Sequence, residues 1–572
     1  MTAHTVAEHL LDHRTIGGHD GCVTVLDSRG TTAQLTYAEL DERARGAAGA
    51  LLARGLVPGD RILLPLPTGV DHLTALLGSL LAGLVPCTIV VPGNPGDPDS
   101  TGMRQYAAVL GVCEPAAVVA EDRATATALA AAPGPGPGAG PGSGHAPGPA
   151  YLSVADLRQP ALPAGELPTR RPEDAHHIQL TSGSTSSPKA AVLTYAQVTA
   201  NIRAIHTALD MTLEHDRVCH WLPLNHDMGF ILTLATLIKG VALDLMPSIS
   251  FLRDPLSWPR HMSRRGATIT TAPPFGYRTV TDRHRRTPDP DLDLSLLRQA
   301  YVGAEPIPLG VLTDFRDTFA GHGLAEGALI PCYGMAETVL AATMALDLRP
   351  PGELSWGRTK AVRLDREELH RHNRVTDCDA GRPSLTVVAC GRPLGGLTVE
   401  IRDPDGALLP DDEIGEIRLR GDSVMAGYLG PGGEPRLVAD RTHATGDLGF
   451  TRDGDLYIVG RLKELIIVNG RNLPPYDVEQ SIETHPDIDA GNSAVFSHTD
   501  DTGERVTAVV ETRVRPDEHD RIRREVATLV RQSFGFNLDE VVVRKRGGIP
   551  RTSSGKRRRG RLRDDHLTGR SA

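Results

Sequence analysis

The chain has 572 residues, which is too long for one hydrophobic core and predicts two or more domains. Hydrophobic residues make up 40% of it and charged residues 23%, and a net charge of −10 at pH 7 gives no support to a nucleic-acid or membrane-surface function. The seven cysteines are scattered and never form a CxxC pair, which argues against a zinc site or a disulfide framework and favours reduced thiols in a cytoplasmic protein.

The first 130 residues alternate Ala/Leu-rich helical stretches with short apolar runs. A helix is predicted at 35–55 and strands at 60–67, 87–92 and 116–120, and this alternation is typical of a parallel, doubly wound sheet. The longest apolar run, 75–91, is short for a membrane-spanning helix and is interrupted by a proline, so it predicts a buried helix followed by a buried strand. We expect no membrane-spanning segment.

A stretch of almost pure Ala, Pro and Gly follows at 132–150. Such a composition cannot bury a core and predicts a flexible surface loop. We interpret it as a loop insertion, because the βα pattern resumes directly after it.

The pattern of predicted secondary structure changes after about residue 389. Short strands separated by turn residues, such as 397–406, 415–422 and 453–460, predict an antiparallel sheet or small β-barrel up to about 460. Beyond about 462, two helices and two strands predict a compact α+β unit of roughly 110 residues.

The segment TSGSTSSPK (181–189) combines six hydroxyl side chains with Gly183 and Lys189 between two apolar runs. Hydroxyl groups and backbone N–H groups of such a loop can wrap a polyphosphate, while a lysine supplies the compensating charge. The spacing differs from GxxxxGK[ST], so a P-loop NTPase is excluded. A Ser/Thr-rich surface loop without a ligand is the alternative.

TSGSTSSPK resembles the phosphate-binding loop of the acyl-adenylate-forming superfamily. The same order of motifs continues with WLPLNHDMGF (221–230), YVGAEPIP (301–308), PCYGMAETV (331–339), ATGDLGF (444–450), RLKELIIVNGRNLPPYDVE (461–479) and PRTSSGK (550–556). The resemblance implies an α/β fold: a large N-terminal AMP-binding domain (1–461) of two α/β subdomains plus a small β-barrel, and a small mobile α+β C-terminal domain (462–572).

HDMG (226–229) and PCYGMAE (331–337) look like the fatty acyl-AMP ligase branch of that superfamily. An extra segment at about 350–388 resembles the insertion that distinguishes these ligases from acyl-CoA synthetases. There the insertion braces the two domains and disfavours the posture that uses coenzyme A. The resemblance therefore implies activation of a fatty acid, or a related acid of secondary metabolism, and transfer to the phosphopantetheine thiol of an acyl carrier protein or synthetase carrier domain.

The resemblance also implies ATP and Mg²⁺ as cofactors and assigns the residues around them. The phosphates would be held by Thr181, Ser182, Gly183, Ser184, Thr185 and Lys189. The adenine would lie against Tyr333, Ala304, Glu305, Gly334, Met335 and Ala336. Asp447 would accept the ribose hydroxyls, Arg461 would lie at the ribose or phosphate edge, Lys463 would be the hinge, and Glu337 would bind Mg²⁺. A core tyrosine at 333, a turn-capping aspartate at 447 and an exposed glutamate at 337 are the alternatives.

Lysine is rare in this chain: among 61 basic residues the lysines are Lys189, Lys239, Lys360, Lys463, Lys545 and Lys556. In the superfamily the lysine matching Lys556 bridges the substrate carboxylate and the α-phosphate. A compact ammonium fits between two oxygens where a planar guanidinium does not. The retention of lysine at 189, 463 and 556 in an arginine-rich chain supports the assignment.

His226 precedes Asp227, but one such pair is poor support for a metal site, so we expect a gate residue beside the α-phosphate or a structural histidine. The acyl pocket is expected around Asn225, Gly229, Pro274, Phe275 and Arg278. Asn225, Pro274 and Arg278 differ from the residues usual in the branch, so a short, aromatic or polar acid, or another oxyanion, is an alternative substrate. An acyl-CoA synthetase and a non-catalytic nucleotide-binding protein are alternative functions. The basic run RRRGRLR (557–563) is expected to be a solvated tail.

Overall fold

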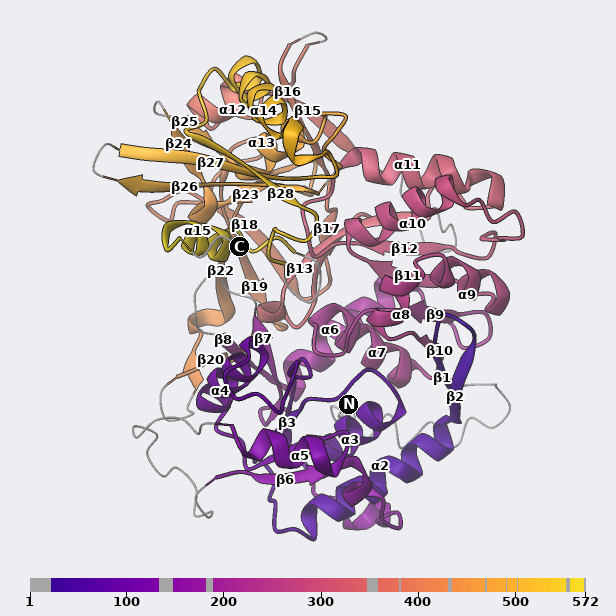
Figure 1. The fold of residues 1–572 in the computed structure, drawn as a ribbon. Helices are drawn as coiled ribbons and strands as arrows, with labels where there is room; N and C mark the ends of the chain where they lie inside the picture. The colour runs from indigo at the N-terminus through magenta and orange to yellow at the C-terminus, as the bar shows by residue number, and fades with distance from the viewer. Residues whose placement is uncertain are drawn as a thin grey trace.

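A computed structural model of the chain describes residues 22–132, 148–181, 189–346, 359–379, 382–430, 435–468, 471–489, 491–500, 503–551 and 556–569. The predicted phosphate-binding residues Ser182, Gly183, Ser184 and Thr185, and most of the loop at 132–150, lie outside these ranges. Figure 1 shows most of the segment 37–132 at the bottom, a large sheet at the right that also includes the strands of residues 22–36, and the C-terminal unit at the upper left.

The first sheet has the predicted parallel, doubly wound pattern, with strand order β4-β3-β5-β6. Helix α2 (Tyr37–Leu52) precedes it and begins at a capping box, in which Thr36 and Glu39 each bind the backbone N–H of the other. The apolar run at 75–91 forms most of α3 and all of β4, as expected. β5 and β6 flank the Ala/Pro/Gly stretch and are parallel neighbours. The other elements are β3 (Arg61–Leu64), α3 (Val70–Leu81), β4 (Val85–Thr88), α4 (Thr101–Cys113), β5 (Ala117–Ala120), α5 (Arg123–Ala130) and β6 (Ala150–Ser153).

The second sheet has nine strands in the order β17-β14-β13-β12-β11-β9-β10-β1-β2, and its six central strands are parallel. Its strands are β1 (Cys22–Leu26), β2 (Thr31–Thr36), β9 (Arg217–His220), β10 (Ala242–Leu245), β11 (Ile269–Ala272), β12 (Gln299–Val302), β13 (Leu329–Gly334), β14 (Ala341–Met344) and β17 (Arg392–Pro393).

Helices cover both faces of this sheet. Successive strand residues point to opposite faces, so they pack in two different cores. On β12, Tyr301 packs with α6 (Tyr195–Leu209) and α7 (Asp227–Lys239), whereas Ala300 and Val302 pack with α9 (Ser257–Arg265), α10 (Pro274–Arg286) and α11 (Leu309–Phe319). The short helix α8 (Ser248–Arg253) precedes α9.

A third sheet, β21-β20-β8-β7, holds the ends of the segment 181–189. β7 (Ala175–Thr181) and β8 (Lys189–Thr194) are antiparallel, and Thr181 lies opposite Lys189. β8 also pairs with β20 (Gly427–Leu429), which pairs with β21 (Pro435–Leu437). The sheet therefore brings a segment from beyond residue 420 next to the predicted phosphate loop.

The strands expected in the small barrel form an antiparallel sheet of β18 (Leu397–Arg402), β19 (Gly415–Gly421), β22 (Thr442–Arg452) and β23 (Asp455–Arg461). The hairpin of β15 (Ala361–Asp365) and β16 (Ser384–Val388), from the predicted insertion, shares a core with Phe450 and Tyr457 of this sheet. Helix α12 (Arg366–His372) lies between the two hairpin strands in the sequence.

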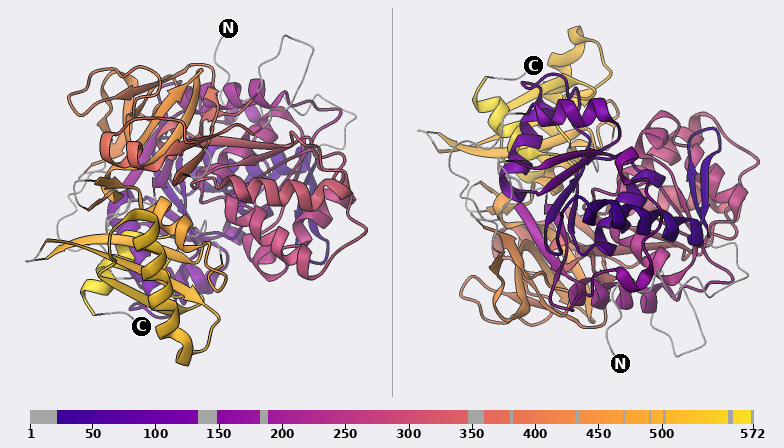
Figure 2. Two further views of the ribbon diagram at one scale, coloured as in Figure 1. Left: turned by 90° about the horizontal axis from the view of Figure 1, so that it is seen from above. Right: turned by 90° about the horizontal axis from the view of Figure 1, so that it is seen from below.

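The C-terminal unit has a hydrophobic core of its own. Figure 2 shows it as the yellow part, beside the antiparallel sheet (orange) and the first sheet (purple). Its elements are β24 (Ile466–Val468), β25 (Arg471–Leu473), α13 (Pro475–Ile482), β26 (Ser493–Asp500), β27 (Gly503–Thr512), α14 (His519–Phe534), β28 (Glu540–Lys545) and α15 (Arg559–Leu567).

The expectation that RRRGRLR is a solvated tail is wrong. Its residues enter helix α15, and Leu562 is fully buried against Phe496 and Ile549. Arg557 and Arg559 are mostly buried because acidic side chains of the same unit neutralise them. Among the described residues, no helix combines the length and apolar composition needed to cross a bilayer.

Candidate active site

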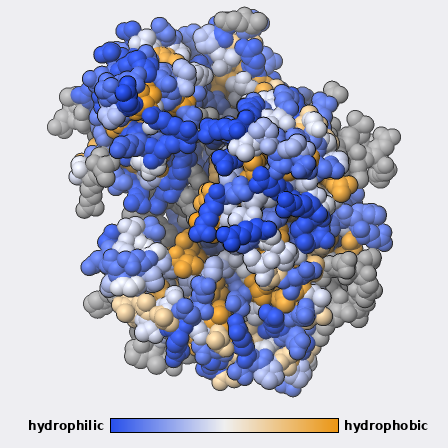
Figure 3. All heavy atoms as spheres, turned by 45° about the vertical axis from the view of Figure 1, so that its right-hand side comes forward, coloured by the Kyte–Doolittle hydropathy of each residue, from blue (hydrophilic) through white to orange (hydrophobic). Residues whose placement is uncertain are grey.

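A cavity of about 1000 Å³ lies at the edge where the parallel strands of the nine-stranded sheet end, and the C-terminal unit closes its other side. Figure 3 shows a mostly polar face of the molecule, hollowed between these two parts. The predicted site residues that line the cavity are Thr181, Lys189, His226, Pro274, Phe275, Arg278, Ala304, Glu305, Tyr333, Gly334, Met335, Ala336, Glu337, Asp447, Arg461, Lys463 and Lys556.

Two residues predicted for the acyl pocket do not line this cavity. The backbone carbonyl of Asn225 accepts a hydrogen bond of 3.0 Å from the Gln179 side chain. Gly229 lies in the first turn of α7, where an added Cβ would stand 2.5 Å from the carbonyl oxygen of Pro223. Close packing therefore accounts for the glycine, and a substrate contact of either residue stays a prediction.

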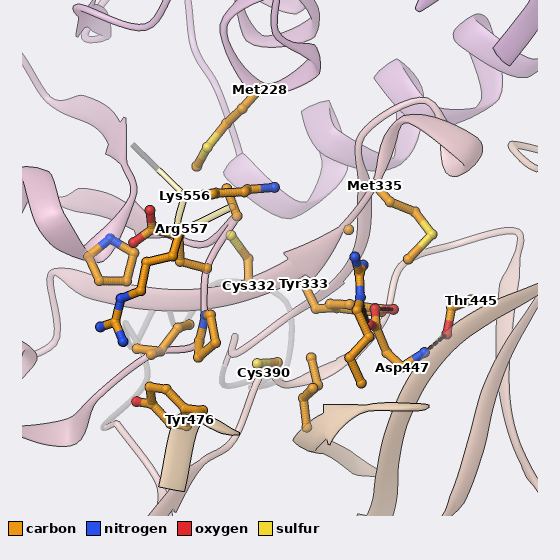
Figure 4. A pocket seen from close by; sticks show the side chains of 18 of the residues that line it. Met228, Cys332, Tyr333, Met335, Cys390, Thr445, Asp447, Tyr476, Lys556 and Arg557 are labelled. Carbon is orange, nitrogen blue, oxygen red and sulfur yellow. Dashed lines mark hydrogen bonds and ion pairs between the residues drawn. The ribbon is translucent and has the colours of Figure 1, made fainter. Parts of the chain in front are cut away.

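Lys556 is the catalytic candidate that comes from the C-terminal unit. Figure 4 shows its side chain extending into the cavity below Met228. Its ammonium group acts to lower the pKa values of Asp227 and Glu305, two carboxyl groups of the N-terminal part. The cation predicted to bridge two anions is therefore inside the cavity in this structure.

The His226–Asp227 pair stands at the start of α7. The Nδ1 atom of His226 is 2.7 Å from Asp227 Oδ1, which also accepts the backbone N–H of Met228. Burial acts to raise the pKa of Asp227, but His226 and Lys556 outweigh it and keep that pKa below its ordinary value. Asp227 is thus a carboxylate at neutral pH, and it orients the imidazole ring toward the cavity edge.

Asp447 is held by two donors at the predicted ribose end. The Tyr333 hydroxyl donates to Oδ2 at 2.8 Å, and Arg461 Nε donates to Oδ1 at 2.7 Å. The backbone N–H of Asp447 donates to Thr445 Oγ1 at 3.0 Å (Figure 4). Burial, followed by the Asp447 charge, raises the pKa of Tyr333, so its phenol stays neutral and its ring plane is fixed. A fixed ring facing a cavity is suited to stacking on a base.

Tyr428 connects the two residues predicted to handle the phosphates, and sequence reasoning missed it. The Lys189 ammonium lies 5.0 Å from the centre of the Tyr428 ring, and the Tyr428 hydroxyl donates to Glu337 Oε1. His443 lines the cavity beside them, and its pKa is lowered chiefly by burial. No motif marks Tyr428, because only the pairing of β20 with β8 brings it there.

Glu305 lies among four basic side chains. Burial raises the pKa of its carboxyl group, although Lys556, Arg557, Arg278 and Arg551 act in the opposite direction. Arg278 faces the C-terminal unit: a Cβ on Gly491 would lie 2.7 Å from its Nη2 atom. Arg278 therefore lies at the domain interface as well as at the cavity wall.

One part of the cavity wall, which we call the apolar arm, belongs to the core between the sheet and α6–α7. Its lining residues are Ile205, Leu209, Leu232, Ala341 and Met344. Each is less than a tenth exposed. The backbone of Ala341 is held by two hydrogen bonds to the Asn201 side chain, at 2.8 and 3.2 Å.

The insertion contacts the C-terminal unit through α12. Arg366 makes a two-pronged ion pair with the fully buried Asp477, at 2.9 and 2.6 Å, and its guanidinium lies 4.5 Å from the centre of the Phe534 ring. The His370 imidazole stands 3.1 Å from the same carboxylate. The residues 347–358 and 380–381 of the insertion lie outside the described ranges.

This combination of a two-part α/β chain and a cavity closed by a C-terminal lysine defines an adenylate-forming enzyme. A family model described as "AMP-binding enzyme" matches residues 18–429, and one described as "Disco-interacting protein 2-like, AMP domain" matches residues 463–571. The chain belongs to the AMP-binding enzymes, the acyl-adenylate-forming superfamily, and within them to the fatty acyl-AMP ligase branch.

Three relatives are similar over nearly the whole chain. A Caulobacter vibrioides protein called "Putative acyl-CoA synthetase" is 34% identical, covering 94% of this chain and 91% of its own. The long-chain-fatty-acid–AMP ligase FadD32 of Mycolicibacterium smegmatis is 30% identical, covering 94% and 90%. The medium-chain-fatty-acid–[acyl-carrier-protein] ligase JamA of Moorena producens is 31% identical, covering 94% and 90%.

Two solved structures are similar to this chain over nearly its whole length. A structure from work on fatty acyl-adenylate ligases of E. coli and L. pneumophila has a TM-score of 0.85 at 30% identity, covering 99% of this chain and 98% of its own. The L. pneumophila ligase in complex with acyl adenylate and pyrophosphate has a TM-score of 0.70 at 26% identity, covering 98% and 96%.

Proposed function

We propose that this chain activates a carboxylic acid with an apolar chain as its acyl-AMP, using ATP, and passes the acyl group to the pantetheine thiol of a carrier protein. One observation carries the proposal: a single cavity holds Lys556 from the C-terminal unit together with Lys189, Asp447 and the His226–Asp227 pair from the N-terminal part.

The reaction joins two anions. A carboxylate oxygen of the acid attacks the α-phosphorus of ATP, the bond to the β-phosphate oxygen breaks, and pyrophosphate leaves. Little covalent help is needed from the protein, so positioning and charge compensation dominate. Lys556 would lie between the carboxylate and the α-phosphate, and Lys189 would neutralise the departing pyrophosphate.

The nucleotide would be oriented by the polar end of the cavity. The ribose hydroxyls would bind Asp447, whose position Tyr333 and Arg461 fix, while the adenine would lie on the Tyr333 ring between Ala304 and Glu305. The predicted phosphate loop at 181–189 would enclose the phosphates, since its two ends meet at the paired residues Thr181 and Lys189.

Mg²⁺ fits the donor set at the phosphate end. Glu337 lines the cavity as a hard oxygen ligand, and Mg²⁺ is commonly bound by one or two carboxylates together with substrate phosphates. The described residues contain no group of three or more His, Cys, Asp and Glu side chains placed to hold a metal. Glu337 would therefore receive a metal that arrives with the nucleotide and supplies further charge compensation.

The acid would enter the apolar arm, whose lining supports an aliphatic chain over a small polar acid. Arg278 was expected in the acyl pocket, but its contact with Gly491 supports a role at the domain interface. The proposed class of substrate is accordingly a fatty acid or a related acid of secondary metabolism.

The test is ATP-dependent pyrophosphate release with saturated acids of graded length, and with hydroxylamine to trap the adenylate. We expect release that needs both ATP and an aliphatic acid, and its absence with every acid would overturn the proposal. Adding coenzyme A or a pantetheinylated carrier protein then identifies the acceptor.

An acyl-CoA synthetase is the second candidate, and the name of the Caulobacter relative favours it. The contact of Arg366 with the buried Asp477 favours the carrier protein, because it ties the insertion to the C-terminal unit. We expect wild-type protein to leave coenzyme A unused and Arg366→Ala to gain some use of it, unlike the exposed control Arg363→Ala. Coenzyme A ligation by the wild type would support the synthetase instead.

A further inference from the structure

Tyr301 has a buried hydroxyl group that the mechanism above does not use. It lies on β12, is 4% exposed, and lines the cavity. Its backbone is fixed, since its carbonyl oxygen accepts the Tyr277 hydroxyl at 2.8 Å and the Thr271 hydroxyl at 3.4 Å. Its side chain is packed in the core as well, so the ring cannot shift easily to find another partner.

The hydroxyl of Tyr301 makes no hydrogen bond within the part of the chain that the structure describes. Other buried polar atoms share this property, such as the indole Nε1 of Trp221, but among the described residues only Tyr301 combines it with a place in the cavity wall. A buried hydroxyl without a partner costs about 1–3 kcal/mol, so a ligand that supplies an acceptor is favoured there.

The position of Tyr301 is at the apolar arm. Its side chain belongs to the same core as Ile205, Leu209 and Leu232, on the α6–α7 face of the sheet. Burial raises the pKa of the phenol, which keeps it a neutral donor at physiological pH. The arm therefore offers one hydrogen-bond donor in otherwise apolar surroundings.

We propose that Tyr301 selects an acid whose apolar chain carries a hydroxyl or keto oxygen remote from the carboxylate. This inference rests on the proposed function and narrows its substrate class. A site built to hydrogen-bond a substrate oxygen discriminates strongly against the analogue that lacks it, because the buried partner is then left unpaired.

The experiment compares each saturated acid with its ω- and (ω−1)-hydroxy and oxo counterparts of equal length in the pyrophosphate-release assay. In wild-type protein we expect kcat/KM to be roughly ten-fold higher for the best oxygenated acid than for its plain counterpart. Tyr301→Phe should bring this ratio close to one while sparing the plain acid. Tyr106→Phe, a buried tyrosine away from the cavity, should leave the ratio unchanged.

A second measurement does not depend on turnover. Acyl sulfamates of adenosine, which mimic the acyl-AMP, are prepared with plain and oxygenated chains, and their dissociation constants are measured by calorimetry. The oxygenated mimic should bind roughly ten-fold more tightly to wild type, and equally to Tyr301→Phe.

The outcomes separate the two proposals. If plain acids are activated but no oxygenated acid is preferred, or if Tyr301→Phe changes both classes equally, the role of Tyr301 is overturned and acyl-AMP formation stands. If neither mimic binds and no acid releases pyrophosphate, both proposals are overturned.

Discussion

Two sets of buried ionisable side chains, one in each part of the molecule, are accommodated in opposite ways. The N-terminal part buries histidines as neutral rings: desolvation lowers the pKa of His177 and of His220 to about 3 and that of His72 to about 4. The network around Glu479 in the C-terminal unit keeps its buried groups charged instead. Glu479 is fully buried yet its pKa is below the ordinary value, because Arg557 and Arg559 outweigh the effect of burial.

The difference follows from the surroundings of each group. The three histidines are shifted chiefly by desolvation, whereas Glu479 has two arginine partners that hold the last helix of the C-terminal unit in place. Glu479 binds Arg559 at 2.7 Å on both oxygens and also binds Arg557, and Arg557 binds Glu483 at 2.9 Å. Lys556 directly precedes these arginines, so the network also places the catalytic candidate.

Removal of the buried Glu479 carboxylate should have the largest effect on the contrast between the two parts. Glu479→Ala leaves Arg557 and Arg559 without their main partner, and loss of one member of a buried ion pair costs about 3–5 kcal/mol. We expect faster hydrogen exchange in β26 and β27, measured by mass spectrometry, and reduced adenylate formation. Glu540→Ala, at a half-exposed pair with His566, is the control and should change exchange little.

Removing the ammonium itself should affect rate and not stability. Lys556→Ala is expected to lower adenylate formation by roughly 10²–10³-fold, the effect of one lost electrostatic contact. ATP affinity should stay close to wild type, because the lysine belongs to the C-terminal unit. The exposed Lys545→Ala is the matched control, and near-normal pyrophosphate release by Lys556→Ala would contradict the role.

The stability of the two parts should depend on pH in different ways in the acid range. A buried histidine with a pKa of about 3 must be neutral in the folded state but is protonated below about 6.5 once unfolded, so its contribution is lost as the pH falls below 6.5. At pH 5 each such ring destabilises the N-terminal part by about 2 kcal/mol.

His220→Gln should therefore flatten the pH dependence of unfolding between pH 6.5 and 5, and the 82% exposed His215→Gln should not. Glu479 behaves differently, because its pKa is lowered in the folded state. Its contribution to stability stays intact down to the ordinary value of 4.5 and is lost as the pH falls from there through the folded-state value. Hydrogen exchange measured during mild acidification tests this contrast. If the C-terminal unit unfolds before the N-terminal part, the contrast is wrong.

The smallest expected effect concerns the apolar arm of the N-terminal part and its selection of acids by chain length. Ala341→Leu adds bulk to the apolar arm at a backbone that Asn201 holds in place, so acids long enough to fill the arm should lose roughly ten-fold in kcat/KM. Short acids should be spared. Ala342→Leu, which is equally buried but faces a different core, should not change the preference for chain length.

Most of the architecture could be predicted from local patterns. The alternation of helices and strands in the first 130 residues gave the parallel sheet, and the resemblance gave the two-part arrangement. β28 and α15 were missed, and the second for a clear reason: a run of arginines has no apolar period, and its burial depends on Glu479, which lies 80 residues away.

The site was predicted less completely than the fold. Residues inside motifs, such as Lys556, Tyr333 and Asp447, line one cavity as expected. Tyr428 was missed because strand pairing alone places it against Glu337. A substrate contact of Gly229 stays a prediction, and the crowding around its Cα position already accounts for the glycine.

The sequence by itself determined the class of chemistry, because the residues predicted to bind a nucleotide occur in short segments. Their spacing can be recognised without knowledge of the fold. Only the tertiary structure decided which distant side chains meet: Arg366 with Asp477, Arg559 with Glu479, and the Tyr301 hydroxyl with the apolar arm. Ion pairs and hydrogen bonds act over a few ångströms, so they depend on how strands pair and helices pack, and not on nearness in the chain.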